Sequence, residues 1–254
     1  MLKIGGGAAT GTVVDAWLNF ETGLDGDDLT NANLAASMVG GSNLSWDDSN
    51  LGVSGSAEIS TAATIQLPAP VDIGGTVYDD AAGTRSCLFS GVGQPNFFEG
   101  SFTVRPSILV YGFWLKLPTN LNWSTQDFFI VNHFLGGFAG IQGYLNGSGP
   151  YVQMRLHMDD SPGTIALANV AGGTTVWVTG VMEDGGNTAA TLYDTVGNIL
   201  GVEASFTDSG TGGDNHLIKI GSSNSSTLTD SFWFDDMVFV EGDASAYPLI
   251  PPTV

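Results

Sequence analysis

Short apolar segments alternate with turn-forming residues along the whole chain, and this pattern restricts the fold more than any other feature. Near the end, residues 217–220 are apolar, residues 221–227 are small or polar, and residues 232–241 are again mostly apolar. Runs of this kind, bounded by Gly, Ser, Asn and Asp, are typical of β-strands joined by turns. The chain also contains 36 glycines, many more than a helical protein needs for its turns. The sequence therefore predicts an all-β fold.

The strongest strand candidate is the segment 107–117, SILVYGFWLKL, which contains almost no polar residue. Such a segment predicts a central strand that is buried on both faces and ended by Pro118. Further strands are expected at residues 13–21, 57–67, 86–90, 97–104, 128–134, 151–158, 165–169, 175–183, 189–194, 199–206, 217–220 and 232–241. Many short strands with turns between them indicate a single antiparallel β-sandwich of the jelly-roll type.

Two other segments are expected to differ from the strands. Residues 29–38, LTNANLAASM, have the Leu and Ala content of one short surface helix. Residues 136–150 are rich in glycine, which predicts a connection between two strands. Cys87 is the only cysteine and lies in an apolar run, so we expect a buried thiol and no intrachain disulfide.

The net charge excludes several classes of partner. Lys and Arg total 6 against 26 Asp and Glu, which gives a formal charge of −20. A nucleic acid is bound largely by cations that displace its counterions, so this chain is not expected to bind one. No apolar run approaches the roughly 20 residues needed to cross a bilayer, and we expect no membrane insertion. The first residues lack the continuous apolar core of a secretion signal, so no signal peptide is expected.

The chain is expected to consist of three parts. Residues 1–10 form a flexible Gly/Ala arm, residues 11–243 form the sandwich, and residues 244–254, ASAYPLIPPTV, form an extended tail. Proline fixes φ and cannot continue a helix or a central strand, so the tail is expected to be irregular or polyproline-like. Exposure of Leu249 would be costly. The two arms therefore predict contacts with other protein subunits of an assembly.

The segment 151–159, YVQMRLHMD, is the best candidate for a binding site because its residues alternate strictly in polarity. One face would carry Tyr151, Gln153, Arg155 and His157. An aromatic ring beside an amide, a guanidinium and an imidazole matches the flat faces and directional hydroxyls of sugars. The alternative is an ordinary solvated strand face, which antiparallel sheets commonly have.

Two further residues complete the predicted ligand-binding set. Trp123 lies in a polar segment, TNLNWSTQD, where an indole could stack on a sugar or cover the edge of the core. Trp46, in SNLSWDDSN, offers the same alternatives. His133 lies in the strand candidate 128–134, and no two of the three histidines have metal-ligand spacing.

Calcium is the one metal that the sequence suggests. Residues 24–28, LDGDD, place Asp25, Asp27 and Asp28 around a glycine that turns the backbone. Ca²⁺ takes several carboxylate and carbonyl oxygens from loops of this kind. The run lacks the spacing of a helix-loop-helix calcium site. Solvated acidic residues that keep the surface soluble are the alternative.

Four segments carry a resemblance to a known family: WLNFETG at 17–23, SILVYGFWLKLP at 107–118, WVTGVMEDGGNTAATLYDTVGNIL at 177–200 and IKIGSSNSSTLTDSFWFDDMVFVE at 218–241. In their order along the chain they resemble the concanavalin A-like lectin/glucanase superfamily, in particular its laminin-G-like members. The resemblance implies a jelly roll, a ligand on the concave sheet and, in many laminin-G-like domains, one calcium ion. These segments are patterns of burial and turns, and they say little about activity.

Signatures of catalysis are weak in the sequence. The glucanases of the superfamily carry Glu-x-Asp-x-Glu or a close variant, and no such run occurs here. Asp235 and Asp236 are adjacent, so on a regular strand they are expected to point to opposite faces. Alginate-lyase-like jelly rolls use a Tyr-x-Lys segment, which Tyr144 and Tyr151 resemble faintly, but the lysine is absent.

Three functions follow as hypotheses. The first is a non-catalytic structural or surface module with glycan binding, similar in type to the decoration proteins and fibres of tailed-phage particles, located on a virion surface or outside a cell. The second is a carbohydrate-active enzyme of the same fold, a polysaccharide lyase or glycoside hydrolase in which Tyr151, Arg155 and His157 act on the sugar. The third is a calcium-dependent lectin. Whether the chain is an enzyme stays open, with non-catalytic function favoured.

Overall fold

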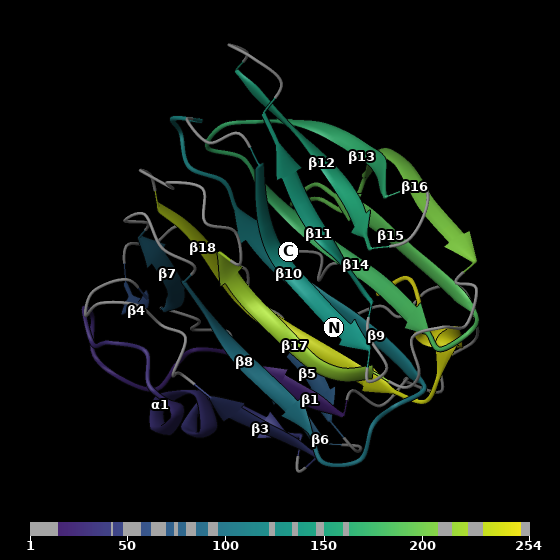
Figure 1. Ribbon diagram of the computed structural model, residues 1–254. Helices are drawn as coiled ribbons and strands as arrows, with labels where there is room; N and C mark the ends of the chain where they lie inside the picture. Colours follow the sequence, from purple (N-terminus) through teal and green to yellow (C-terminus); the bar gives the residue numbers. More distant parts are fainter. Residues whose placement is uncertain are drawn as a thin grey trace.

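The computed structural model is a sandwich of two antiparallel β-sheets (Figure 1). It describes residues 15–41, 43–47, 57–61, 70–73, 76–79, 85–90, 96–121, 125–133, 137–145, 150–159, 163–207, 215–222 and 231–249. The predicted all-β antiparallel sandwich is confirmed. In Figure 1 one sheet lies in front of the other, with the short helix α1 beside β3 at one end.

The first sheet has seven strands in the order β13-β12-β11-β10-β17-β8-β3. Their bounds are β3 Leu44–Asp47, β8 Asn96–Phe102, β10 Thr125–His133, β11 Phe138–Tyr144, β12 Tyr151–Met158, β13 Thr164–Ala171 and β17 Asn215–Ser222. Strands β10 to β13 follow one another in the chain and pair in that order, so they form a meander.

The second sheet has nine strands, of which seven follow the order β16-β15-β14-β9-β18-β1-β2, while β7 pairs with β18 and β4 pairs with β7. Their bounds are β1 Ala16–Leu18, β2 Met38–Gly40, β4 Ala57–Ser60, β7 Ser86–Ser90, β9 Ile108–Lys116, β14 Thr175–Glu183, β15 Asn187–Tyr193, β16 Ile199–Thr207 and β18 Ser231–Glu241. A separate two-stranded ribbon consists of β5 Pro70–Ile73 and β6 Thr76–Asp79.

Aromatic side chains fill the space between the sheets. Tyr111 and Phe113 of β9 meet Phe129 of β10 with ring centroids 4.4 and 5.3 Å apart. Phe89 stacks on Phe232 at 5.3 Å. Cys87 is fully buried in the same core, as predicted, and burial raises the pKa of its thiol well above the usual value.

A second apolar cluster lies on the other face of the nine-stranded sheet, and the end of the chain covers part of it. The strap, defined here as residues 244–249, begins with the short 3₁₀ helix η1, Ala244–Ala246. Leu249 is fully buried among Trp114, Trp177 and their neighbours. Its carbonyl accepts a hydrogen bond from Trp177 Nε1 at 2.7 Å, and its N–H donates to Thr179 Oγ1 at 3.1 Å.

The strap explains why the central strand is buried on both faces. The inner side chains of β9 contact the core between the sheets, and its outer side chains belong to the second cluster. The prediction that Leu249 avoids solvent is confirmed, although the cover is the chain's own sheet. The arm 1–10 and residues 250–254 lie outside the described residues, and their predicted contacts with other subunits stay predictions.

The structure differs from the sequence-based prediction most clearly at β11. Residues 136–150 were expected to be a connection, but residues 138–144 form a strand in the middle of the seven-stranded sheet. Its glycines allow close approach between strands: a Cβ atom at Gly140 would lie 2.1 Å from the carbonyl oxygen of Phe129. Glycine here reflects tight pairing and not a turn.

Two smaller segments also show what the pattern could and could not reveal. Helix α1, Asn31–Ala36, lies inside the predicted range 29–38, and the Thr30 side chain caps it by accepting from Asn33 N at 3.2 Å. Trp46, which lies in the polar segment SNLSWDDSN, is part of β3. Its ring contacts Phe98 edge-on at 5.3 Å.

The expectation that Asp235 and Asp236 point to opposite faces is wrong, because β18 has a bulge at this pair. The register shifts between Asp235 and Val238, and φ of Asp236 is 47°. Asp235 stands opposite Trp114, and Asp236 Oδ1 accepts a hydrogen bond from Trp17 Nε1 at 3.0 Å. Both tryptophans belong to the second cluster, so both carboxylates lie on that side of the sheet.

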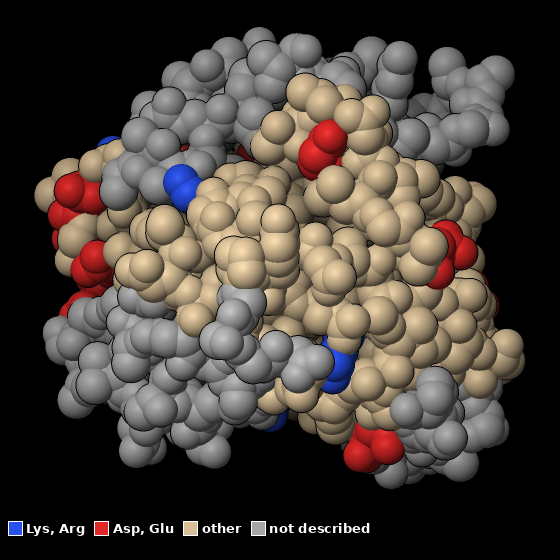
Figure 2. All heavy atoms as spheres, turned by 90° about the horizontal axis from the view of Figure 1, so that it is seen from above, with Lys and Arg blue, Asp and Glu red and all other residues tan. Residues whose placement is uncertain are grey.

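Charged side chains are sparse on the side of the molecule that Figure 2 shows. Figure 2 shows Asp and Glu in small separate groups and Lys and Arg only at isolated points, between larger areas of other residues. Within the described part of the chain, no helix is long and apolar enough to cross a membrane.

Candidate binding face

Strand β12 alternates as the sequence predicts. Val152, Met154, Leu156 and Met158 are buried in the core between the sheets. Tyr151, Gln153, Arg155 and His157 lie on the opposite, outer side of the strand, where Tyr151 is 55% exposed. Four of the six predicted ligand-binding residues therefore share one face of one strand.

The Arg155 side chain is held by two neutral groups. Its Nε donates a hydrogen bond to Gln153 Oε1 at 2.7 Å, and its guanidinium carbon lies 3.8 Å from the centroid of the Tyr144 ring. Tyr144 belongs to β11 and stands directly opposite Gln153. Stacking on an aromatic ring and a hydrogen bond at one edge together fix the plane of the guanidinium.

A second polar group lies beside Arg155 and centres on Asp127 of β10. Its Oδ1 atom lies 2.9 Å from Nδ1 of His157 and 2.8 Å from Nε2 of Gln142. Nε2 of Gln142 also lies 2.9 Å from Nδ1 of His157. A carboxylate oxygen can only accept, so a hydrogen bond to Asp127 needs a hydrogen on Nδ1, and in the neutral ring with that hydrogen Nε2 is an acceptor. The Phe138 ring contacts His157 edge-on at 4.9 Å. The imidazole is thereby held in one orientation.

Local irregularity of β10 places Asp127 on this face. The register with β11 shifts between Asp127 and Phe129, and both Phe128 and Phe129 belong to the core between the sheets. The bulge allows two consecutive residues, Phe128 and Phe129, to point into the core. Asp127 therefore stands opposite Gln142, and Gln142 stands opposite Arg155. The three residues thus form one row across three strands.

The candidate binding face is defined here as the outer side of β10, β11 and β12 with the residues Asp127, Gln142, Tyr144, Tyr151, Gln153, Arg155 and His157. His133 lies at the end of β10, but its side chain is not among those described, and Trp123 lies outside the described residues. Their part in ligand binding stays a prediction.

Three residues of this face were not in the predicted set. Gln142 and Tyr144 were missed because residues 136–150 were interpreted as a connection, so nothing indicated that they lay beside β12. Asp127 is absent from the predicted set because the apolar pattern places the start of this strand at Phe128, whereas β10 begins at Thr125. A single carboxylate directly before the apolar run FFIV is the signal that could have identified it.

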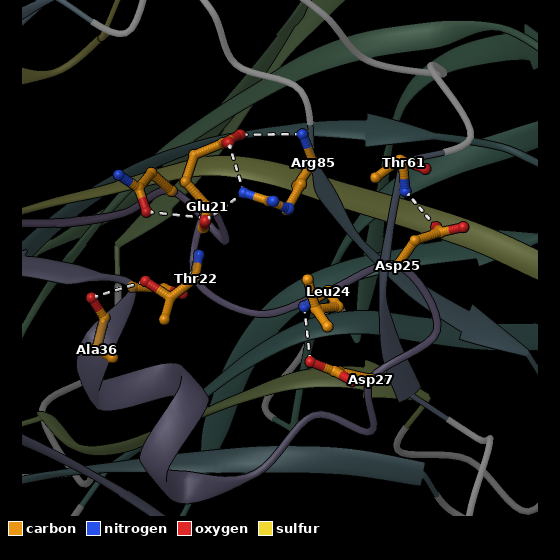
Figure 3. A network of polar contacts seen from close by, with 10 residues as sticks. Glu21, Thr22, Leu24, Asp25, Asp27, Ala36, Thr61 and Arg85 are labelled. Atoms are coloured by element: carbon orange, nitrogen blue, oxygen red, sulfur yellow. Dashed lines mark hydrogen bonds and ion pairs between the residues drawn. The ribbon is translucent and has the colours of Figure 1, made fainter.

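In the acidic loop, residues 24–28, two carboxylates accept hydrogen bonds from backbone N–H groups (Figure 3). Asp25 Oδ1 accepts from the N–H of Thr61 at 2.7 Å, and Asp27 Oδ2 accepts from the N–H of Leu24 at 2.6 Å. The hydrogen bond from Thr61 lowers the pKa of Asp25. Asp28 pairs through its backbone with Glu58. Among the described residues, no three metal-ligating side chains come close enough to hold an ion.

Calcium binding by Asp25, Asp27 and Asp28 stays a prediction. If the loop binds the ion, added Ca²⁺ will raise the melting temperature and a chelator will reverse the rise, because a ligand stabilises the state that binds it. An unchanged melting temperature at millimolar Ca²⁺ would count against the site.

Replacing Glu58 with glutamine is expected to stabilise the fold at neutral pH. Partial burial, and then the charges of Asp25 and Asp28, raise the pKa of Glu58. A raised carboxyl pKa means that the folded state binds the proton more tightly, so the ionised form destabilises the fold. Thermal melts should show a higher melting temperature for Glu58→Gln at about pH 7, and no difference at about pH 3, where Glu58 is protonated in both states. A gain that persists at the lower pH would contradict the electrostatic explanation.

No protein-family model matches the chain, and no curated protein matches it. Among solved structures, tailspike protein 2 of Escherichia coli O157:H7 bacteriophage CAB120 matches with a TM-score of 0.49 and 13% identity, over 67% of this chain and 25% of that one. The receptor-binding domain of botulinum neurotoxin D gives 0.42 and 12%, over 75% and 45%. GH43B from the xyloglucan PUL of Bacteroides ovatus gives 0.45 and 11%, over 61% and 32%. The chain spans less than half of each protein, and likeness at this level says nothing about side chains.

Proposed function

We propose that the chain is a surface β-sandwich module that binds glycans through the candidate binding face. The observation that carries the proposal is the fixed polar arrangement on β10, β11 and β12: a guanidinium stacked on Tyr144 beside an imidazole held by Asp127. Directional donors and acceptors beside exposed aromatic surface are what sugar hydroxyls and ring faces require.

Pre-organisation supports the proposal further. The Arg155 side chain is held by Gln153 and Tyr144, and the His157 side chain by Asp127 and Phe138. A ligand that meets side chains already in position loses less affinity to their ordering. Tyr151, which is more than half exposed at the start of β12, adds a ring on which a sugar can stack.

The proposal includes a family and a location. We place the chain in the concanavalin A-like lectin/glucanase superfamily, near its laminin-G-like members, on the strength of the four segments described above. We also propose an extracellular or virion-surface location in which the arm 1–10 and the tail 244–254 contact other subunits.

Glycan binding is tested by screening the intact chain against a panel of acidic and neutral oligosaccharides and measuring any binding by isothermal titration calorimetry. Tyr151→Ala is expected to weaken binding about tenfold, because an exposed stacking ring contributes on the order of 1 kcal/mol. Ile199→Ala is the matched control, because Ile199 is 59% exposed on the edge strand of the other sheet. A panel without binding, or equal affinities for the two variants, would contradict the proposal.

A second candidate function is polysaccharide β-elimination, which the Asp127–His157 pair favours. With a hydrogen on Nδ1, the Nε2 atom of His157 can accept the proton that lies α to a uronate carboxylate, while Arg155 neutralises that carboxylate. The electron pair of the broken C–H bond then forms a carbon–carbon double bond as the sugar–oxygen bond β to the carboxylate breaks, and the departing oxygen takes up a proton from water. The unsaturated product absorbs in the ultraviolet. Incubation with uronate polysaccharides tests this function, and glycan binding without a rise in absorbance would leave the non-catalytic module.

A further inference from the structure

Arg155 is held by neutral groups, and Lys116 likewise lies over the neutral Trp233 ring at 5.6 Å, whereas two other described cations lie beside carboxylates. Arg85 lies 3.7 Å from Glu21, and Lys219 lies 3.8 Å from Glu99. Arg155 instead contacts an amide oxygen and a phenol ring, and no described carboxylate lies within ion-pair distance of it. In a chain with 26 Asp and Glu, a surface arginine placed among neutral partners keeps its charge available for a ligand.

The nearest acidic residue in the same row is separated from Arg155 by an amide. Asp127 stands opposite Gln142, and Gln142 stands opposite Arg155. Asp127 is 4% exposed, and the same oxygen contacts Gln142 and His157. Asp127 is therefore bonded within its own polar group, and no ion pair joins it to the guanidinium of Arg155.

From this arrangement we infer that the ligand of the binding face is a sugar with an isolated carboxylate, such as a uronic acid or a sialic acid, held by Arg155. The inference rests on the proposed glycan-binding function. The Nε donor is used by Gln153, which leaves the four N–H groups of the two terminal nitrogens. Two parallel N–H donors match the two oxygens of a carboxylate.

The charge of the whole chain limits the number of carboxylates. A protein with a formal charge of −20 repels a polyanion, and on the side of the molecule that Figure 2 shows, the described Lys and Arg appear only singly. One carboxylate needs one fixed guanidinium, whereas a sulfated chain needs a row of cations. The ligand is accordingly a short oligosaccharide with one acidic sugar, and not a heparin-like polymer.

The test compares two sugars that differ in one group. A trisaccharide that ends in a uronic acid and its carboxyl-reduced counterpart are titrated into the intact chain by calorimetry. The wild type should bind the acidic form about tenfold to a hundredfold more tightly, the range expected for a charge-assisted pair. Arg155→Gln should remove this preference. Arg155→Lys keeps the charge but lacks the two parallel N–H donors of the guanidinium, so it should reduce the preference. Lys219→Gln is the matched control and should leave it unchanged.

Each remaining outcome overturns a defined statement. Equal affinity of the wild type for both sugars would refute the carboxylate inference while supporting glycan binding. A preference that survives in Arg155→Gln would refute the role of Arg155, and tighter binding of a heparin fragment would refute the limit to one carboxylate. Binding of neither sugar type by wild type would overturn the inference and the proposed function together. Thermal melts of both Arg155 variants check that they are folded, which we expect because Arg155 is only partly buried, on the outer side of β12.

Discussion

Replacing Leu249 with alanine is expected to lower the free energy of unfolding by about 2–5 kcal/mol, the range for removing a large apolar side chain from a packed site. Leu249 is fully buried in the second cluster, where it and Trp177 together occupy the space over Gly112: a Cβ atom at Gly112 would lie 2.5 Å from Trp177 Cζ2 and 3.3 Å from Leu249 Cδ1. The substitution also loosens a segment whose backbone is bonded to Trp177 and Thr179.

The measurement is urea unfolding followed by tryptophan fluorescence, since Trp114 and Trp177 lie in the affected cluster. Leu24→Ala is the matched control, because Leu24 is 69% exposed and the same atoms are removed. The control should change stability by about 0.5 kcal/mol or less. Equal losses for the two variants would show that the strap contributes nothing to stability.

Replacing Gly140 with alanine is expected to destabilise the protein by roughly 3 kcal/mol or more, because the added methyl meets backbone and not a movable side chain. The Cβ atom would lie 2.1 Å from the carbonyl oxygen of Phe129 and 3.0 Å from Cα of Ile130. Strands β10 and β11 must therefore separate. Since Gly140 stands opposite His157, the shift also disturbs the binding face.

Gly137→Ala provides the comparison for this variant. Gly137 has nothing within 4 Å of the added atom, and its φ is +82°. Alanine at this position should destabilise the protein by about 1–2 kcal/mol, the cost of a left-handed backbone conformation for a residue with a side chain. Urea unfolding should rank Gly140→Ala below Gly137→Ala in stability, and glycan titration should show reduced affinity only for Gly140→Ala. The reverse order of stability would contradict the close approach of β10 and β11.

The sequence pattern predicted the fold class well because the burial of a strand determines which of its positions are apolar. The segment 107–117 could be identified as a central strand because both of its faces must be apolar, and β12 could be oriented because its polarity alternates. The fully polar side of β12 was also recognisable. These are properties of single strands, and a single strand is what a local pattern describes.

The part of the site that the sequence did not reveal depends on which strands are neighbours. Glycine at position 140 is as typical of a turn as of a tightly packed strand, so β11 was missed together with Gln142 and Tyr144. The bulges at Asp127 and at Asp236 change which way a side chain points, and periodicity alone assumes that no bulge is present. The partners of Arg155 and His157 became visible only with the register of three strands.

The pairing of β1 with β18 has a consequence for how the protein is made. Ala16 stands opposite Phe239, so β1, which can pair early with β2, receives its second neighbour only after more than two hundred further residues have been synthesised. Contacts between residues so distant in sequence slow folding, since a large loop must close before they form. Until then the nascent polypeptide carries an unfinished sheet with exposed edges, and a cell that produces it must protect those edges from other chains.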